Sequence, residues 1–399
     1  MNVLRDLRGS LAYFGVMFVL GMVISSLGPT LPYLAEDLET SLSSAGILFS
    51  TRSLGYMLGA LLLGRAFDRL PGNRLLMSWL FLIALVCVLI PISPVLLLTA
   101  MLLFVSGICL SGMDVGSNTL VMWKNGARSG TILNGLFLFG SLGGFFVPMI
   151  VGGFVSVGYN IHWVYWLLAV LVLPIAIWIR SIPSPEPPDD TSEDSSFRLD
   201  FRLIGIFGAL FFFYVSIEAS FIGWIYSYML SISQSQITLA ASITSLFWGA
   251  LAIGRVIAIP LAGRLKPFTI SRINMMGALL SIALILISPN SVVAVAVGTF
   301  GLGLSMASSL PTMFSLARTV MPISGRLTGI LWSFGSVGAM ITPWMIGQLM
   351  ERYGTEAMMR TLFLYILLAV MVLGLLWAFT ARKGIGDAHQ RLEVESIIK

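Results

Sequence analysis

One long apolar stretch, from Leu96 to Val121, holds side chains whose types and spacing suggest chemistry. Asp114 is the only charged residue within it, and Asn118 follows four residues later, with Ser111 three residues before. On a helix these three side chains share one face. A carboxylate placed in hydrocarbon costs about 3 kcal/mol or more, so it is retained where it faces a cavity, a partner or a pathway. We therefore expect this face to line a central cavity.

Three further charged residues, Arg52, Glu218 and Arg255, also fall inside apolar runs. Arg52 and Glu218 lie at similar depths in their runs, which permits an ion pair near an outer gate. Arg255 and Asp114 both lie in the inner halves of their runs, so they could form a second pair. Each arginine could also belong to a purely structural ion pair, and both interpretations stay open.

Aromatic residues accompany the carboxylate in the run that contains Glu218. Trp224 and Tyr228 lie four residues apart and share a helical face, while Trp248 and Trp332 occupy deep positions in two later runs. Carboxylates accept protons from sugar hydroxyls, and aromatic rings cover the C–H face of a sugar. These residues therefore indicate a sugar site. A belt of interfacial aromatics is the alternative, above all for Tyr228 near the end of its run.

The composition identifies the elements that must position these side chains. The 399-residue chain is 57% hydrophobic and only 10% charged, with a mean hydropathy of +0.94. Soluble domains carry roughly 25% charged residues. We therefore expect an all-α polytopic membrane protein with twelve transmembrane helices. The expected spans are 10–34, 44–66, 74–92, 95–121, 130–155, 162–180, 202–229, 238–264, 270–288, 292–316, 325–349 and 358–381.

A polar segment divides the spans into two sets of six. Residues 181–200 are rich in proline and acidic residues, which is typical of a flexible linker without a buried apolar face. We expect one six-helix bundle in residues 1–180 and a second in 201–381, followed by a tail at 382–399.

The basic residues predict the orientation of the chain. Nineteen of the 23 Lys and Arg residues fall in segments that share one side of the membrane with the termini, and only Arg352 and Arg360 fall in loops on the other side. Positive residues concentrate on the cytoplasmic side. Cytoplasmic termini and a cytoplasmic linker in a cell membrane, inner or plasma, are therefore expected.

An internal repeat relates the two sets of spans. Gly140-Ser-Leu-Gly143 in the fifth span, followed by Pro148, reappears 195 residues later as Gly335-Ser-Val-Gly338, followed by Pro343. Matching offsets in other span pairs indicate that the halves are copies related by pseudo-two-fold symmetry. Such halves hold substrate between them near the bilayer midplane and rock about it.

Several function classes lack support in the sequence. Cys87 and Cys109 lie in apolar runs without metal-type spacing, and His162 and His389 have no evident partners. Nucleotide loops, zinc spacings and nucleophile elbows are missing from the sequence. Because these motifs are missing, an enzyme is not expected. The basic pI near 9.4 is explained by the cytoplasmic loops, so a nucleic-acid binder is not expected either. A sensor or membrane enzyme on a transporter scaffold would need an output domain or catalytic residues.

The loop between the second and third spans carries a charge pattern. Gly64 to Arg74 places Asp68 and Arg69 at a helix end among further bases, where they could form a charge lock that resets as the halves move. The stretch resembles the GxxxDRxGxR signature of the major facilitator superfamily.

Further segments resemble the sodium-dependent glucose transporter branch of that superfamily, which is related to the fucose permeases. The matching stretches begin at Gly28, Thr51, Asp114, Ile217, Ser245 and Pro322. The resemblance implies cation coupling and sugar binding by Asp114 and Asn118, and polar substrate contacts by Asn134 and Glu218. The first span lacks the aspartate that fucose permeases carry, which disfavours proton symport by two carboxylates.

These observations predict a secondary active transporter that moves a monosaccharide by alternating access coupled to a cation. Sodium is favoured, because Asp114, Asn118 and nearby oxygens could bind a hard ion, and a proton carried by Asp114 is the alternative. No resident cofactor is expected. The expected partners are a small-molecule sugar and membrane lipids, and we expect a monomer. An exporter of amphipathic compounds or lipids is the competing function, since Met and Phe surfaces adapt to many ligands.

Overall fold

The computed structural model describes residues 2–125, 129–186, 201–233, 236–321 and 325–383. In the first half of the chain the elements are α1 (Asn2–Asp37), α2 (Leu42–Ala45), α3 (Ile47–Arg69), α4 (Gly72–Leu89), a 3-10 turn η1 (Ile90–Ile92), α5 (Leu96–Asn125), α6 (Ser129–Ser156) and α7 (His162–Arg180). In the second half they are α8 (Phe201–Ile232), α9 (Ile237–Ala262), α10 (Pro267–Ile287), α11 (Val292–Met306), α12 (Ser309–Arg318), α13 (Gly325–Tyr353) and α14 (Glu356–Lys383).

The described part of the chain contains twelve helical segments that are long and apolar enough to cross a membrane, and no strand. All twelve predicted spans are therefore confirmed, and the protein is a multi-pass membrane protein. A helix satisfies its own backbone hydrogen bonds, which is why apolar runs of this length fold as helices in hydrocarbon. One difference from the prediction is a break in the tenth span, where α11 ends at Met306 and α12 begins at Ser309.

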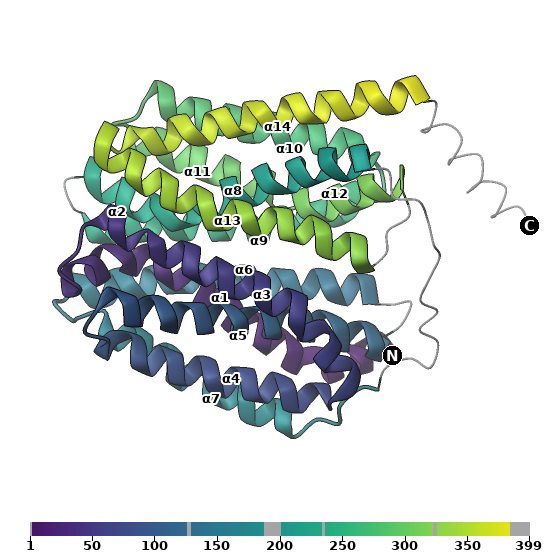
Figure 1. The fold of residues 1–399 in the computed structure, drawn as a ribbon, viewed down its shortest axis with the longest axis horizontal. Helices are drawn as coiled ribbons and strands as arrows, with labels where there is room; N and C mark the ends of the chain where they lie inside the picture. Colours follow the sequence, from purple (N-terminus) through teal and green to yellow (C-terminus); the bar gives the residue numbers. More distant parts are fainter. Residues whose placement is uncertain (1, 126–128, 187–200, 234–235, 322–324, 384–399) are drawn as a thin grey trace, which may run out of the picture.

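The two halves lie side by side with their helices roughly parallel (Figure 1). Helix α1 begins and α14 ends at the same end of the molecule, which we call the terminal end, and the opposite end is the far end. Helices α3 and α13, α6 and α9, and α1 and α8 form the main contacts between the halves.

The internal repeat is visible in how the helices pack. In the first half, Gly143 of α6 lies against the backbone of Phe18 in α1, and in the second half Gly338 of α13 lies against Phe212 in α8. Each glycine lets one backbone approach another closely, as small residues do in membrane helix pairs. The two copies therefore share a packing scheme as well as a sequence pattern.

The far end is closed by contacts between the halves. The Ser50 hydroxyl of α3 donates to the carbonyl of Met340 in α13 at 2.5 Å, and Ser53 donates to the Ala339 carbonyl at 3.1 Å. Beyond them, the Ser43 hydroxyl donates to the carboxylate of Glu351. The two bonds to carbonyl oxygens join neutral groups and contribute modestly to stability, whereas the bond to the Glu351 carboxylate is charge-assisted and stronger.

We expect Gly21→Ala to lower the unfolding temperature of the purified protein. A Cβ at residue 21 would overlap the carbonyl oxygen of Gly140 in α6, and overpacking of this kind costs about 1–3 kcal/mol. Gly153→Ala is the matched control, because a Cβ there meets nothing within 4 Å. The measurement is thermal unfolding in detergent, and equal unfolding temperatures for the two variants would contradict the packing described here.

Candidate transport site

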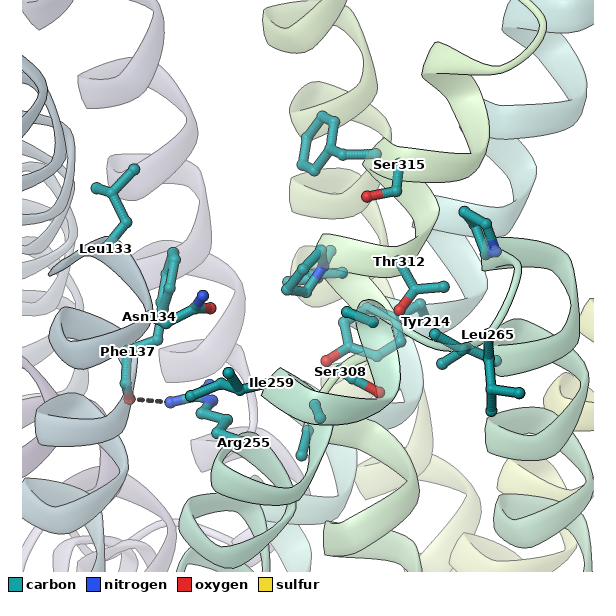
Figure 2. A pocket seen from close by; sticks show the side chains of 18 of the residues that line it. Leu133, Asn134, Phe137, Tyr214, Arg255, Ile259, Leu265, Ser308, Thr312 and Ser315 are labelled. Atoms are coloured by element: carbon teal, nitrogen blue, oxygen red, sulfur yellow. Dashed lines mark hydrogen bonds between the residues drawn. The ribbon is translucent and has the colours of Figure 1, made fainter. Parts of the chain in front are cut away.

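A cavity of about 520 Å³ lies between the two halves (Figure 2). Helix α6 forms its wall in the first half, and α8, α9, α12 and α13 contribute most of the wall in the second half. The polar and aromatic residues that line it are Asn134, Phe137, Tyr214, Glu218, Arg255, Ser308, Thr312, Phe314, Ser315 and Trp332. The tertiary structure thus brings together four residues that the sequence analysis selected: Asn134, Glu218, Arg255 and Trp332.

The cavity extends toward the terminal end of the molecule. Leu265, in the connection between α9 and α10, lines it, and so do Pro267 at the start of α10 and Leu133 in the first turns of α6. The contacts of α3 with α13 close the opposite end. The structure is therefore open at the terminal end and closed at the far end.

Arg255 links the two halves at the cavity wall. From α9 it donates a hydrogen bond to the carbonyl oxygen of Phe137 (Figure 2) and another to the hydroxyl of Ser141, both in α6. Its guanidinium also lies 5.6 Å from the centroid of the Phe137 ring. Arg255 interacts electrostatically with Glu218 and Asp114 but forms no direct ion pair with either carboxylate, both of which the structure describes. The expected ion pair between Arg255 and Asp114 is therefore not formed. The guanidinium instead donates its hydrogen bonds to a carbonyl and a hydroxyl of α6.

Asp114 is held by two neighbours within the first half. The Asn118 amide donates to the Asp114 Oδ1 atom at 2.8 Å, and the Tyr56 hydroxyl donates to the Oδ2 atom. The prediction that Asp114 and Asn118 share one helical face is confirmed by this hydrogen bond. Neither residue is among those that line the cavity in this structure, which corrects that expectation, because Asp114 is turned toward Tyr56 of α3.

Tyr56 is not among the residues that the sequence pattern predicts for the site. Its position in the middle of the second span, too deep for an interfacial belt, was the available signal. Together with Asn118 it supplies a donor to each oxygen of the carboxylate, so the aspartate is satisfied inside the protein.

Arg52 does not pair with Glu218. Its guanidinium instead donates to the carbonyl oxygen of Ile24 in α1 at 3.1 Å. The expected Arg52–Glu218 pair is corrected: Arg52 turns into its own bundle while Glu218 faces the cavity between the bundles. The side chains of Asp68 and Arg69, at the end of α3, lie outside the described part of the structure, so the expected charge lock stays a prediction.

Three of the selected aromatic residues lie away from the cavity. Trp224 is fully buried and donates from Nε1 to the carbonyl of Pro343 at 2.8 Å. Tyr228 is also fully buried, and its hydroxyl is 3.4 Å from the carbonyl of Pro289. Trp248 lies against Gly144 of α6, at the interface between the halves. Their expected place in the cavity wall is corrected, because each ring fills space between helices.

The part of the chain that the structure describes holds no group of three His, Cys, Asp or Glu side chains suited to bind a metal ion. A cation at Asp114 would therefore be bound by one carboxylate with amide, hydroxyl and carbonyl oxygens.

The comparisons with known proteins agree with this architecture. A model of the Major Facilitator Superfamily matches residues 13–343. Sodium-dependent glucose transporter 1 of Xenopus laevis is 26% identical over 360 residues, which cover 82% of this chain and 73% of that protein. Major facilitator superfamily domain-containing protein 4A of Danio rerio is 25% identical over 437 residues, covering 87% of this chain and 83% of that protein.

Solved transporter structures share the fold. A mutant of the nucleoside transporter NupG aligns with a TM-score of 0.72 at 15% identity, covering 94% of this chain and 99% of that chain. A bacterial homologue of the human lysosomal transporter Spinster, in an inward-facing and occupied conformation, aligns with a TM-score of 0.73 at 12% identity, covering 98% and 97%.

Cysteine labelling can check which end of the cavity is open. In a protein lacking Cys87 and Cys109, which are both buried, Asn134→Cys should react with a membrane-impermeant maleimide supplied from the terminal side. Val151→Cys in the same helix is the control and should stay unreacted, because its side chain is fully buried. Labelling of Asn134→Cys from the far side alone would contradict the opening described here.

Proposed function

The chain belongs to the major facilitator superfamily, in its sodium-dependent glucose transporter-like branch, and we propose that it moves a monosaccharide across the membrane in a step coupled to a cation. The protein is a transporter of this superfamily with twelve spans in its described part. The observation that carries the proposal is the cavity between the halves, in which a carboxylate, a guanidinium, an amide and an indole converge.

The cavity residues suit a polyhydroxylated solute. Glu218 accepts hydroxyl protons, Arg255 donates to sugar oxygens, and the Asn134 amide does both. Trp332 offers an apolar ring for the C–H face of a sugar ring. Transport follows if the halves rock so that the far end opens while the terminal end closes.

Asp114 is the proposed coupling residue. Its carboxylate oxygens are ligands that a hard cation such as Na+ prefers, and in this structure they accept hydrogen bonds from the Asn118 amide and the Tyr56 hydroxyl. A proton carried by Asp114 is the alternative coupling ion.

The proposed orientation follows from the basic residues. If the terminal end faces the cytoplasm, as their distribution indicates, this structure is the inward-open state of a cell-membrane protein, inner or plasma. We propose that the protein works as a monomer and is not an enzyme, since its family and structural neighbours are transporters.

A second candidate is an exporter of amphipathic compounds or lipids. The observation that favours it is the apolar mouth of the cavity, lined by Leu133, Ile259, Leu265 and Phe314. A panel of sugars distinguishes the candidates. A monosaccharide transporter shows counterflow of at least one labelled sugar from the panel, whereas an exporter of amphipathic compounds shows none.

We expect proteoliposomes containing the protein to accumulate D-glucose under an inward Na+ gradient. The reason is that ion movement down its gradient supplies the free energy for uphill sugar uptake. A pH gradient without Na+ is the comparison condition. Accumulation driven by the pH gradient alone would replace Na+ by H+ as the coupling ion, and equilibration without accumulation in both conditions would contradict coupled transport.

Asp114→Asn should abolish accumulation while sugar exchange continues, because the amide removes the charge that binds the cation but leaves the cavity residues in place. The measurement compares concentrative uptake with equilibrium exchange of the same labelled sugar. Asp37→Asn is the matched control, since Asp37 lies at the end of α1 beside His162 and away from the cavity. Normal concentrative uptake by Asp114→Asn would overturn the assignment.

A further inference from the structure

The break in the tenth span forms part of the cavity wall. Helix α11 ends at Met306 and α12 starts at Ser309, and the intervening residues Ala307 and Ser308 both line the cavity. Irregular backbone at membrane depth is tolerated where it lines a cavity, and in transporters discontinuous helices mark binding sites. The apolar run at 292–316 predicts one continuous helix, so the break is a feature that only the structure shows.

Two side chains from neighbouring helices fix the break in place. The Tyr214 hydroxyl of α8 donates to the carbonyl of Met306 at 3.0 Å, which satisfies a backbone group freed at the end of α11. The Asn274 amide of α10 donates to the hydroxyls of Ser308 at 2.9 Å and Ser309 at 3.2 Å. Both Tyr214 and Asn274 are buried. The start of α12 is therefore held in a defined orientation toward the cavity.

Three hydroxyl side chains follow one face of this segment. Ser308, Thr312 and Ser315 are spaced by four and three residues, so they share a helical face, and all three line the cavity (Figure 2). Across the cavity they face Leu133 and Asn134 of α6.

Thr312 is the most informative of the three. Its side chain is only 6% exposed, yet among the described residues its hydroxyl has no hydrogen-bond partner. Buried polar groups in folded proteins are almost always hydrogen-bonded. The Ser308 hydroxyl accepts a bond from Asn274, which leaves its own proton free to donate. The α12 face thus presents unused donors and acceptors to whatever fills the cavity.

The hydroxyl groups on the α12 face indicate which class of ligand it would bind. Its hydroxyls are neutral and both donate and accept, so they match the hydroxyl groups of a neutral polyol better than a charged group. The charged residues Glu218 and Arg255 lie on other helices of the same cavity. A ligand that contacts both the charged residues and the hydroxyl face extends across the cavity from α8 and α9 to α12.

We propose that Ser308, Thr312 and Ser315 form a sugar-hydroxyl subsite, in which Thr312 bonds one hydroxyl of the transported monosaccharide. The inference deepens the proposed function and depends on it. In the ligand-bound state the Thr312 hydroxyl forms a hydrogen bond with one hydroxyl of the sugar. Ser308 and Ser315 form hydrogen bonds with the neighbouring hydroxyls of the same sugar. The broken tenth span therefore contributes to sugar specificity.

The test uses the full-length protein in proteoliposomes and counterflow of D-glucose and its 2-, 3-, 4- and 6-deoxy analogues. Thr312→Val replaces the hydroxyl by a methyl group of similar size. Loss of one hydrogen bond between neutral groups should raise the KM for D-glucose roughly 2- to 10-fold, with the maximal rate little changed. One deoxy analogue should have the same KM for wild-type and Thr312→Val protein, because it lacks the hydroxyl that Thr312 binds.

Thr299→Val is the matched control. Thr299 lies in α11 of the same span, is fully buried and also lacks a partner for its hydroxyl, but it does not line the cavity. It should leave every KM unchanged, and Thr312→Ser, which keeps the hydroxyl, should restore the wild-type KM for D-glucose.

The outcomes separate this inference from the proposed function. If the wild-type protein shows counterflow of D-glucose and Thr312→Val changes neither its KM nor the ranking of the analogues, the subsite is wrong and monosaccharide transport stands. If all five sugars lose affinity equally in Thr312→Val, the residue acts on structure only and the subsite is again wrong. If the wild-type protein shows no counterflow of any of the five sugars, glucose transport itself is overturned and the subsite with it.

Discussion

Every backbone amide and carbonyl within the hydrocarbon region needs a partner inside the protein, and the rest of this structure depends on that constraint. Helices meet it along the spans of the described part by internal hydrogen bonds, with short joins between α2 and α3 and between α4 and η1 near the ends of the second and third spans. The tenth span breaks at Ala307 and Ser308, and there the Tyr214 hydroxyl donates a hydrogen bond to the carbonyl of Met306. The exception lies beside the cavity, where a polar backbone and polar side chains meet solvent or solute rather than lipid.

Close packing of glycines makes each half a compact body. Gly143 and Gly338 occupy equivalent places, one against α1 and the other against α8, so the same contact stiffens both bundles. Between the bundles the far-end contacts of Ser50 and Ser53 are single hydrogen bonds to carbonyl oxygens. Because the far-end hydrogen bonds of Ser50 and Ser53 join neutral groups and each contributes little, the far end can open by motion of one half against the other.

The charged residues divide between the bundles in a way that suits coupling of two sites. Asp114 is held inside the first half by Tyr56 and Asn118, whereas Glu218 faces the cavity from the second. Arg255 acts electrostatically on both carboxylates while bonding to the backbone of α6. The proposed coupling residue and the cavity carboxylate therefore lie in different halves, which Arg255 joins at the cavity wall.

The amino-acid sequence by itself determined the twelve spans, their arrangement as two copies and the adjacency of Asp114 to Asn118. These features depend on hydrophobic run length, on a fixed offset and on the helical period, all of which are local along the chain. Tertiary structure alone decided which deep side chains reach the cavity. Trp332 lines it while Trp248 lies against Gly144, and Arg52 turns to the Ile24 carbonyl rather than to Glu218. The depth of a residue can be read from its place in a span, but the direction it faces depends on how each helix is rotated against its neighbours, which packing between distant segments sets.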